Sequence, residues 1–283
     1  MEFQHNEMLE EYGNFKVSVI DGIDGSGKGS ATEEMAEIIS GLGYNVLTVD
    51  YPQYDALWGQ IIQKLLDTDD PTIDIYQRMA IYALNRLESV PSLKAQMKDI
   101  GSFYNTTYVL FDRFITSNAM TCAYYSKKDP KILDDIESLY KFMFDLDSTF
   151  LSILHIPDFH VVVPTIDHGK AMQAVEKDTQ RSGTDLYEQV DILKLGNRIY
   201  HEFAVLDPRR FTLLNQDSSY GRRMSRDRIA REIIKIQFGE IAEYGDRKGR
   251  VYRFQFDQSK VDTSLFKPIL DRFPSLRLLN PYK

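Results

Sequence analysis

The chain has 283 residues, of which 43% are hydrophobic and 27% are charged, as is usual for a globular protein with a full core. Its 34 basic and 42 acidic residues give a net charge of −8, which argues against a general nucleic-acid-binding protein. No apolar run approaches the roughly 18 residues of a membrane helix, and the acidic first residues are unlike a signal peptide. The single cysteine, Cys122, cannot form an internal disulfide, so we expect a small core residue in a reducing compartment. These features predict a soluble, cytoplasmic protein without a membrane or nucleic-acid partner.

A glycine-rich turn near the start of the chain carries the strongest functional signal. Val17–Ser30 (VSVIDGIDGSGKGS) begins as an apolar strand and leads into a segment of helical spacing, Ala31–Ser40. Gly22, Gly27 and Lys28 have the G-x-x-x-x-G-K spacing of a phosphate-binding loop. Glycines let successive N–H groups converge on an anion, and the helix N-terminus and the lysine add positive charge. The stretch predicts a nucleotide-binding enzyme.

One position of this loop departs from its commonest form. Gly29 stands where a Ser or Thr that binds magnesium usually follows the lysine, and the hydroxyl comes one residue later, at Ser30. This GKG[ST] variant resembles the loop of adenylate kinases. The departure leaves the protein ligand of the metal open.

Beyond the loop, short apolar runs alternate with helical spacing. Further strands are expected at Tyr44–Val49, Tyr108–Phe111, Phe159–Val163 and Phe211–Leu214. Helices are expected at Trp58–Leu66, Ile75–Val90, Phe114–Tyr125, Ile132–Asp145 and Ser225–Phe238, with a helix–loop–helix over Ile166–Gln189. The alternation predicts an α/β fold of the P-loop NTPase type, with a five-stranded parallel sheet and helices on both faces. Ligands of such sheets bind at the carboxyl ends of the strands.

Local signals add detail to this outline. Asp69 or Asp70 could cap the helix that begins at Ile75, and Pro91 is expected to interrupt it before a further helix. From Gly239 onward the pattern changes: Val251–Phe256 alternates like a strand, and a last helix is expected before the C-terminus. We therefore expect one catalytic domain over residues 14–237 and a small appendage of unknown role over residues 238–283.

Four motifs, in this order and spacing, resemble those of the thymidylate kinase family of P-loop nucleoside monophosphate kinases. They are the loop GIDGSGKGS, YALNRLE over Tyr82–Glu88, DRFITSN over Asp112–Asn118 and EKDTQRSGTDLYE over Glu176–Glu188. The resemblance covers residues 14–237. It implies an ATP- and Mg²⁺-dependent phosphotransferase that converts dTMP to dTDP for dTTP biosynthesis, and a homodimer.

The resemblance also implies residues for the donor phosphates and for catalysis. The loop residues that would bind ATP are Asp24, Gly25, Ser26, Gly27, Lys28, Gly29 and Ser30. Arg113 would reach the phosphates between donor and acceptor, and Asp112 would act on magnesium through water, together with Ser30. Lys177 and Arg181 lie four apart on an expected lid helix and would close over ATP. The plainer alternatives are an Arg113–Asp112 salt bridge, a helix cap at Asp112 and an ordinary charged surface helix.

For the acceptor, the resemblance implies a pocket for a deoxynucleotide. Tyr82 would stack on the base, and Arg86 would contact the base or the phosphate. Asp24 would recognise the 3′-hydroxyl of the sugar, while Ser117 and Asn118 would lie near the thymine edge. The alternative is that Tyr82 belongs to a core stripe and Arg86 to a solvated face.

Two departures put the acceptor in question. The family commonly carries an arginine for the acceptor phosphate after the second strand, where this chain has DYPQY, offering Tyr51 and Tyr54. Thr121 replaces a family tyrosine, with Tyr124 and Tyr125 one turn later.

Other functions therefore stay open. The chain could be a kinase for another deoxynucleotide or for a deoxynucleoside, since Asp21 is placed where deoxynucleoside kinases have a catalytic acid. A nucleotide-binding module with weak or no catalysis is a further alternative.

Overall fold

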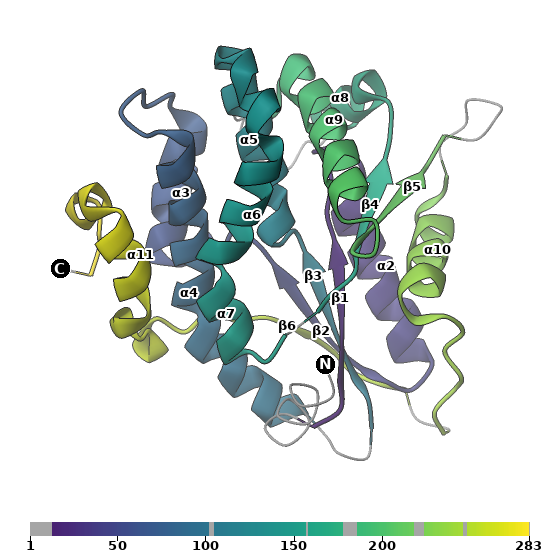
Figure 1. Cartoon of the computed structure of the whole chain (residues 1–283). Coiled ribbons are helices and arrows are strands. Elements are labelled where there is room, and N and C mark those ends of the chain that lie inside the picture. Colours follow the sequence, from purple (N-terminus) through teal and green to yellow (C-terminus); the bar gives the residue numbers. More distant parts are fainter. Residues whose placement is uncertain are drawn as a thin grey trace.

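A parallel β-sheet lies at the centre of the computed structural model, which describes residues 13–101, 105–156, 158–177, 186–217, 224–245 and 248–282. The strand order is β5-β4-β1-β3-β2-β6, and every neighbouring pair is parallel (Figure 1). The strands are β1 (Phe15–Ile20), β2 (Asn45–Asp50), β3 (Thr107–Asp112), β4 (Val161–Thr165), β5 (Phe211–Asn215) and β6 (Val251–Arg253). The predicted α/β architecture with a parallel sheet is confirmed. In the described part of the chain the sheet has six strands rather than five, because β6, from the stretch expected to alternate like a strand, joins its edge.

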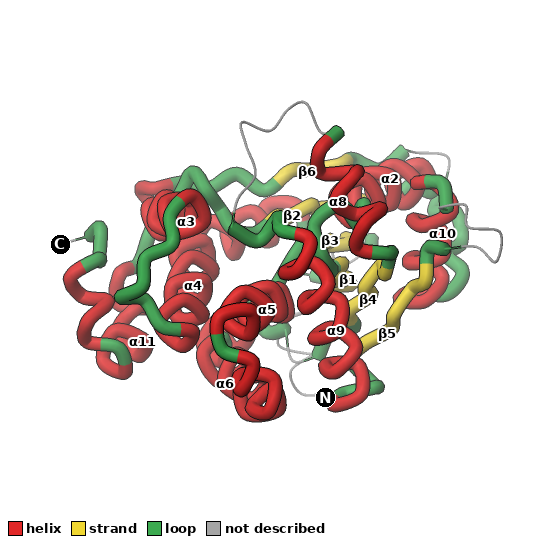
Figure 2. Tube along the Cα trace, turned by 90° about the horizontal axis from the view of Figure 1, so that it is seen from above, coloured by secondary structure: helices red, strands yellow, loops and turns green. Residues whose placement is uncertain are grey.

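Helices cover both faces of the sheet (Figures 1 and 2). One face is covered by α2 (Lys28–Gly41) and α10 (Arg226–Phe238). The helices on the other side are α3 (Leu57–Asp67), α4 (Ile75–Ile100), α5 (Asn118–Lys128), α6 (Ile136–Leu146), α7 (Ser148–Ile153) and α9 (Val190–Leu206). Two shorter helices are α8 (His168–Glu176) and α11 (Lys267–Arg272). None of the helices in the described part of the chain is long and apolar enough to span a membrane.

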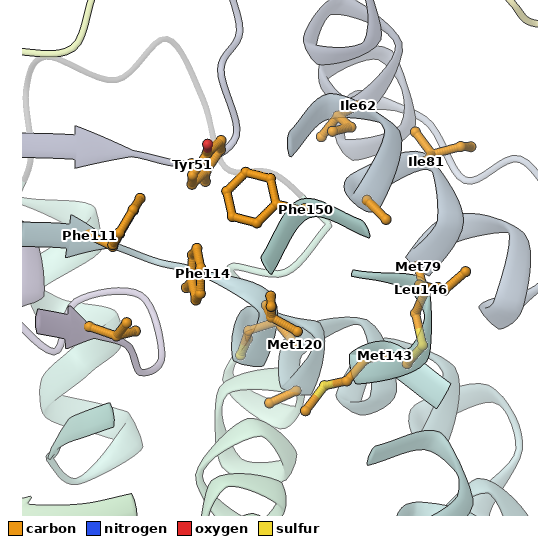
Figure 3. Close-up of a cluster of buried hydrophobic side chains, with 14 of the residues drawn as sticks. Tyr51, Ile62, Met79, Ile81, Phe111, Phe114, Met120, Met143, Leu146 and Phe150 are labelled. Atoms are coloured by element: carbon orange, nitrogen blue, oxygen red, sulfur yellow. The ribbon is translucent and has the colours of Figure 1, made fainter. Parts of the chain in front are cut away.

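Alternate side chains of the strands supply the two cores, as the period of two along a strand requires. In β3, Leu110 packs toward α2 and α10, whereas Phe111 faces the larger cluster on the other side. Figure 3 shows this larger cluster, in which Phe111 and Phe114 lie with ring centroids 4.6 Å apart beside Tyr51 and Phe150. Tyr51 and Phe114 of this group follow the carboxyl ends of β2 and β3 and line the candidate site.

The start of α4 differs from its prediction. Asp74, rather than Asp69 or Asp70, caps the helix in a reciprocal capping box: the Asp74 carboxylate accepts from the Gln77 N–H at 2.8 Å, and the Asp74 N–H donates to the Gln77 side chain at 2.9 Å. Asp70 instead binds Thr72 in the preceding loop. The cap is the residue that directly precedes the helical spacing, as capping geometry requires.

The predicted break at Pro91 was also wrong, because α4 continues through it to Ile100. A proline removes one backbone hydrogen bond from a helix and crowds the preceding turn. Val90, Leu93 and Met97 are nevertheless buried on either side of it, so tertiary packing outweighs the local penalty.

The C-terminal segment contributes to both the sheet and the core. In β6, Val251 pairs with Val46 of β2, and Phe266 further along is fully buried against Trp58 of α3 at 6.3 Å between ring centroids. The last helix is α11, followed by a 3₁₀ turn over Pro274–Leu278. The division of the chain into a domain at residues 14–237 and an appendage at residues 238–283 stays a prediction.

Candidate active site

The glycine-rich loop between β1 and α2 has the backbone of an anion-binding cradle. Gly22, Gly25 and Gly27 have φ angles of 141°, 75° and 82°, which side chains with a Cβ rarely adopt. The loop is fixed from beneath by Gln216, whose side-chain amide donates to the Ser26 carbonyl at 2.7 Å. The Ser26 hydroxyl is buried and has no hydrogen-bond partner in the described part of the chain. With α2 beginning at Lys28, the loop and helix N-terminus are suited to phosphate.

Two cations meet on one carboxylate at the edge of this loop. The Lys28 ammonium lies 3.1 Å from Oδ1 of Asp24, and the Arg113 guanidinium forms an ion pair with the same oxygen. Burial and the nearby Arg113 lower the pKa of Lys28, against the effect of Asp24. Burial also acts to lower the pKa of Arg113, but Asp24 and Asp112 outweigh it and hold that pKa above its ordinary value. Lys28 and Arg113 are therefore both charged and both paired with Asp24.

The register of the sheet brings Arg113 to the loop. Ile20 of β1 lies opposite Asp112 of β3, so the residues that follow these two strands emerge side by side. The Arg113 N–H donates to the Ile20 carbonyl at 2.9 Å, and its φ of 66° is unusual for a residue other than glycine. Backbone strain of this kind is concentrated at functional sites, and here it places the guanidinium.

The carboxylate of Asp112 occupies the space that a side chain at residue 29 would need. A Cβ built on Gly29 would lie 2.9 Å from Oδ2 of Asp112, closer than such atoms approach without displacement. Loss of solvation raises the pKa of Asp112 to about 6, although Lys28 and Arg113 act in the opposite direction. Its other oxygen, Oδ1, is buried without a hydrogen-bond partner among the described residues.

That orphaned carboxylate oxygen fits a cation bound nearby. Asp112, with the Ser30 hydroxyl in the first turn of α2, would hold Mg²⁺, which when bound neutralises charge on the nucleotide phosphates. No group of three or more acidic, His or Cys residues among those described could hold a metal by itself. A magnesium site with few protein ligands is in keeping with the preference of this ion for water and phosphate oxygens.

A pocket of about 480 Å³, including the solvent at its mouth, is lined by Arg113 and by Asp24 of the loop. Its lining contains all eight residues that the sequence predicts for the acceptor: Asp24, Tyr51, Tyr54, Tyr82, Arg86, Arg113, Ser117 and Asn118. The other lining residues are Pro52, Leu66, Phe114, Met120 and Tyr187. The structure thus brings the predicted acceptor residues together, and their individual roles stay predictions.

Arg86 lies in this pocket with its charge already paired. Its Nε and one terminal nitrogen donate to the two carboxylate oxygens of Asp147 at 2.6 and 2.7 Å, and the two side chains are 3% and 0% exposed. The suggestion that Arg86 belongs to a solvated face is therefore wrong. The two parallel bonds fix the plane of the guanidinium in the pocket wall.

Asn118 lines the pocket and has a carboxamide that is only partly hydrogen-bonded. Its amide nitrogen donates to the Ile115 carbonyl at 3.1 Å, while its oxygen is buried without a partner among the described residues. The whole residue is 3% exposed. The neighbouring Ser117 hydroxyl differs, because it donates to Asp21 at 2.8 Å.

Asp21 ties the loop to the segment after β3. Its carboxylate accepts from the hydroxyls of Thr116, Ser117 and Tyr200 at 2.6, 2.8 and 2.7 Å. The Gly22 N–H adds a fourth bond at 2.9 Å. A fully buried carboxylate with four donors acts as a structural anchor in this arrangement.

Tyrosines form much of the pocket wall, and one of them was missed in the sequence. The hydroxyl of Tyr187 lies 3.0 Å from Oγ1 of Thr121, the residue that replaces a family tyrosine. The D-x-Y-E pattern after the lid motif was the signal that could have identified Tyr187. Tyr51 lies deeper, with its hydroxyl 2.7 Å from that of Ser89, whereas Tyr54 is exposed at the rim. The apolar lining residues carried no distinct sequence signal.

The segment predicted to form a lid lies partly among the described residues. Helix α8 approaches the loop so closely that a Cβ on Gly25 would lie 2.1 Å from the Ala171 carbonyl oxygen. Lys177 is exposed and is the C-cap that directly follows this helix. Arg181 lies outside the described residues, so its predicted alignment with Lys177 stays a prediction.

The fold is that of the P-loop kinases that act on nucleotides. A sequence model for thymidylate kinase matches residues 20–222, and the chain belongs to the thymidylate kinase family. The family implies a nucleoside monophosphate kinase, a phosphotransferase that uses ATP and Mg²⁺.

Two solved structures show the same fold. Thymidylate kinase from Candida albicans is 17% identical, with a TM-score of 0.54 over 79% of this chain and 91% of that chain. Thymidylate kinase from Ehrlichia chaffeensis is 16% identical, with a TM-score of 0.50 over 79% of this chain and 98% of that chain. No curated protein sequence matches the chain.

Proposed function

We propose that the protein transfers the γ-phosphoryl group of ATP to dTMP, giving ADP and dTDP. The observation that carries this proposal is the position of Arg113, which lines the acceptor pocket and shares Asp24 with Lys28 of the phosphate-binding loop. In this proposal one guanidinium would lie between the donor and acceptor phosphates. Phosphoryl transfer depends on aligning two anionic groups and neutralising their charge, and a bidentate cation at that point does both.

On the donor side, the loop amides and Lys28 would hold the ATP phosphates, and Ser30 and Asp112 would hold Mg²⁺. Nucleotide phosphates would then replace Asp24 as the anionic partner of Lys28 and Arg113. Lys177 and Arg181 of the lid would add charge and exclude water on closure.

On the acceptor side, the pocket offers groups that fit a thymine base. The unpartnered oxygen of Asn118 would accept the N3–H of thymine, and Arg86, oriented by Asp147, would donate to a ring carbonyl. Cytosine carries an acceptor at its N3 and would leave the Asn118 oxygen unpaired, at a cost of about 1–3 kcal/mol. Tyr82 would stack on the base, and Asp24 would contact the sugar.

The acceptor phosphate has fewer cations than the family pattern provides. No arginine follows β2, and Tyr54 at the rim offers a neutral hydroxyl, so Arg113 would carry most of the phosphate binding. We expect weaker binding of the monophosphate as a result. The C. albicans enzyme is described as having broad substrate specificity, which makes a panel of acceptors the appropriate test.

A deoxynucleoside kinase is the second candidate, since it needs no cation after β2. Against it, the Asp21 carboxylate that would serve as its catalytic acid accepts four hydrogen bonds within the protein. We further infer a homodimer and a cytoplasmic role in dTTP biosynthesis from the family alone. Analytical ultracentrifugation would test the dimer.

The experiment is ADP release from Mg-ATP with dTMP, dUMP, dGMP, dCMP, AMP and thymidine as separate acceptors. Preferred turnover of dTMP, lost in Lys28→Ala and Arg113→Ala, would support the proposal. Preference for another monophosphate would show that the pocket recognises a different base. Preference for thymidine would favour the deoxynucleoside kinase. No turnover with any acceptor would favour a binding module without catalysis.

A further inference from the structure

The C-terminal segment, residues 251–282, wraps from the sheet edge to the helices beside the acceptor pocket. After β6, the Phe254 N–H donates to the Thr48 carbonyl at 2.8 Å, and the Asp257 N–H donates to Ser92 of α4 at 3.0 Å. Figures 1 and 2 show the end of the chain lying against α3 and α4. There Phe266 packs between Trp58 of α3 and Tyr282, with 5.7 Å between the Phe266 and Tyr282 ring centroids.

This segment meets α3 at a buried carboxylate. Glu88 of α4 accepts from the N–H groups of Leu57 and Trp58 at 2.8 and 3.0 Å. These are the first two residues of α3, whose N-cap, Ala56, provides no side-chain hydrogen bond. The Tyr282 hydroxyl donates to the same carboxylate. Glu88 of α4 therefore caps the N-terminus of α3. The hydrogen bond from Tyr282 fixes the Glu88 carboxylate in this position.

The start of α3 is in turn rigidly connected to the pocket wall. A Cβ on Gly59 would lie 1.8 Å from the Gln53 carbonyl oxygen, so α3 packs backbone to backbone on this residue. The Gln53 N–H and carbonyl are both bound by Asn85, at 2.9 and 3.0 Å. Pro52 and Tyr54, on either side of Gln53, line the acceptor pocket. A shift of the first turn of α3 would therefore move this wall.

We propose that Tyr282 is a positioning residue for acceptor binding, acting through Glu88 on the first turn of α3 and hence on the wall formed by Pro52 and Tyr54. The inference rests on the proposed function in taking the acceptor as the ligand of this pocket. The phosphate-binding loop takes no part in these contacts. Loss of the Tyr282 hydroxyl should therefore weaken the acceptor and spare ATP.

The test compares Tyr282→Phe, which keeps the ring on Phe266, with Gln96→Ala as a matched control. Gln96 of α4 also binds this segment, through two hydrogen bonds to the Gln255 backbone at 3.1 and 3.3 Å. Neither of these bonds involves Glu88 or α3. The Tyr282→Phe variant loses the bond to the Glu88 carboxylate and an exposed bond that the Tyr282 hydroxyl accepts from the Gln258 side chain at 2.9 Å. Because the bond to the charged group is the one that reaches α3, we expect this variant to raise the acceptor KM by roughly three- to tenfold. The KM for ATP and kcat should stay within about twofold in both variants, and Gln96→Ala should leave all three unchanged.

Amide hydrogen exchange provides a readout that does not depend on catalysis. Faster exchange across residues 53–60 in Tyr282→Phe, absent in Gln96→Ala, would support the proposal. An unchanged acceptor KM, or equal increases in the KM for acceptor and ATP, would overturn it. If the wild-type protein turns over no acceptor, the proposed function fails. Hydrogen exchange then decides on Tyr282 alone: faster exchange across residues 53–60 in Tyr282→Phe would support its positioning role, and unchanged exchange would overturn it.

Discussion

A methyl group on Gly29 would lie 2.9 Å from Oδ2 of Asp112, so the residue after the P-loop lysine and the residue at the end of β3 compete for the same space. This contact accounts for the glycine where many phosphate-binding loops have a serine or threonine. With glycine at residue 29, the nearest hydroxyl after the lysine is that of Ser30, and the carboxylate of Asp112 lies beside the loop.

Gly29→Ala should therefore destabilise the protein and impair catalysis. Alanine favours a helix by up to about 1 kcal/mol over glycine, but the crowded carboxylate should reverse the sign and lower the free energy of unfolding by about 1–2 kcal/mol. Displacement of Asp112 should reduce kcat/KM by roughly ten- to hundredfold. Denaturant titration and steady-state kinetics would measure both effects.

Gly41→Ala, in the last turn of the same helix, is the control. A Cβ there would meet no atom within 4 Å, so this variant should be as stable as the wild type or slightly more so. Equal stability and activity in the two variants would contradict the steric account of Gly29.

The features that could be predicted from the sequence are those that depend on residues close together along the chain. Short apolar runs predicted five of the strands, and glycine spacing identified the loop. The chemistry-bearing residues lie at or after the carboxyl ends of strands, so a parallel sheet gathers Lys28, Asp112 and Arg113 at one edge.

What could not be predicted depends on contacts between distant segments. Asp147, which pairs with Arg86, lies 61 positions away along the chain, and no local spacing identifies it. Pro91 has the signature of a helix break, which buried neighbours override. Strand β6 spans three residues and is mostly exposed, so its place at the sheet edge follows from pairing with β2.

The buried pair of Arg86 and Asp147 should be important for stability. Asp147→Asn leaves a buried guanidinium without its counter-charge, which should lower the free energy of unfolding by about 3–5 kcal/mol. The misoriented guanidinium should also raise the acceptor KM. As control, Glu137→Gln removes the exposed pair with Lys141 and should leave stability nearly unchanged. Similar losses in the two variants, by urea titration, would argue against a special role for the buried pair.

Cys122 should be unreactive in the folded protein. It is fully buried, and burial raises the pKa of its thiol from 9.0 to about 12. Because the thiolate is the nucleophile, about one molecule in ten thousand would carry it at pH 8. The folded state holds this proton more tightly than the unfolded chain, so the group reduces stability as the pH rises from 9 to 12.

Labelling with iodoacetamide at pH 8, with and without denaturant, would check this prediction. Alkylation should be slow in the native protein and complete in the unfolded one. Equal rates in both samples would show that the thiol is accessible.

Arg113→Lys should uncouple nucleotide binding from catalysis. A lysine keeps the charge but cannot form the bidentate contacts of a guanidinium, so kcat should fall by roughly a hundred- to a thousandfold, while the Kd for ATP changes little. Arg210→Lys, which alters ion pairs with Asp158 and Asp207, should keep wild-type activity. Isothermal titration and kinetics of both variants would test the assignment, and retention of most activity in Arg113→Lys would refute it.

The most direct test of the central claim follows the phosphoryl group itself. Wild-type protein would be incubated with dTMP and Mg-ATP carrying a radiolabelled γ-phosphate, and the products would be separated by chromatography. Direct transfer predicts that the label appears in dTDP, with one ADP formed for each dTDP. Label released as inorganic phosphate, or retained in ATP while the protein is folded, would contradict the assignment.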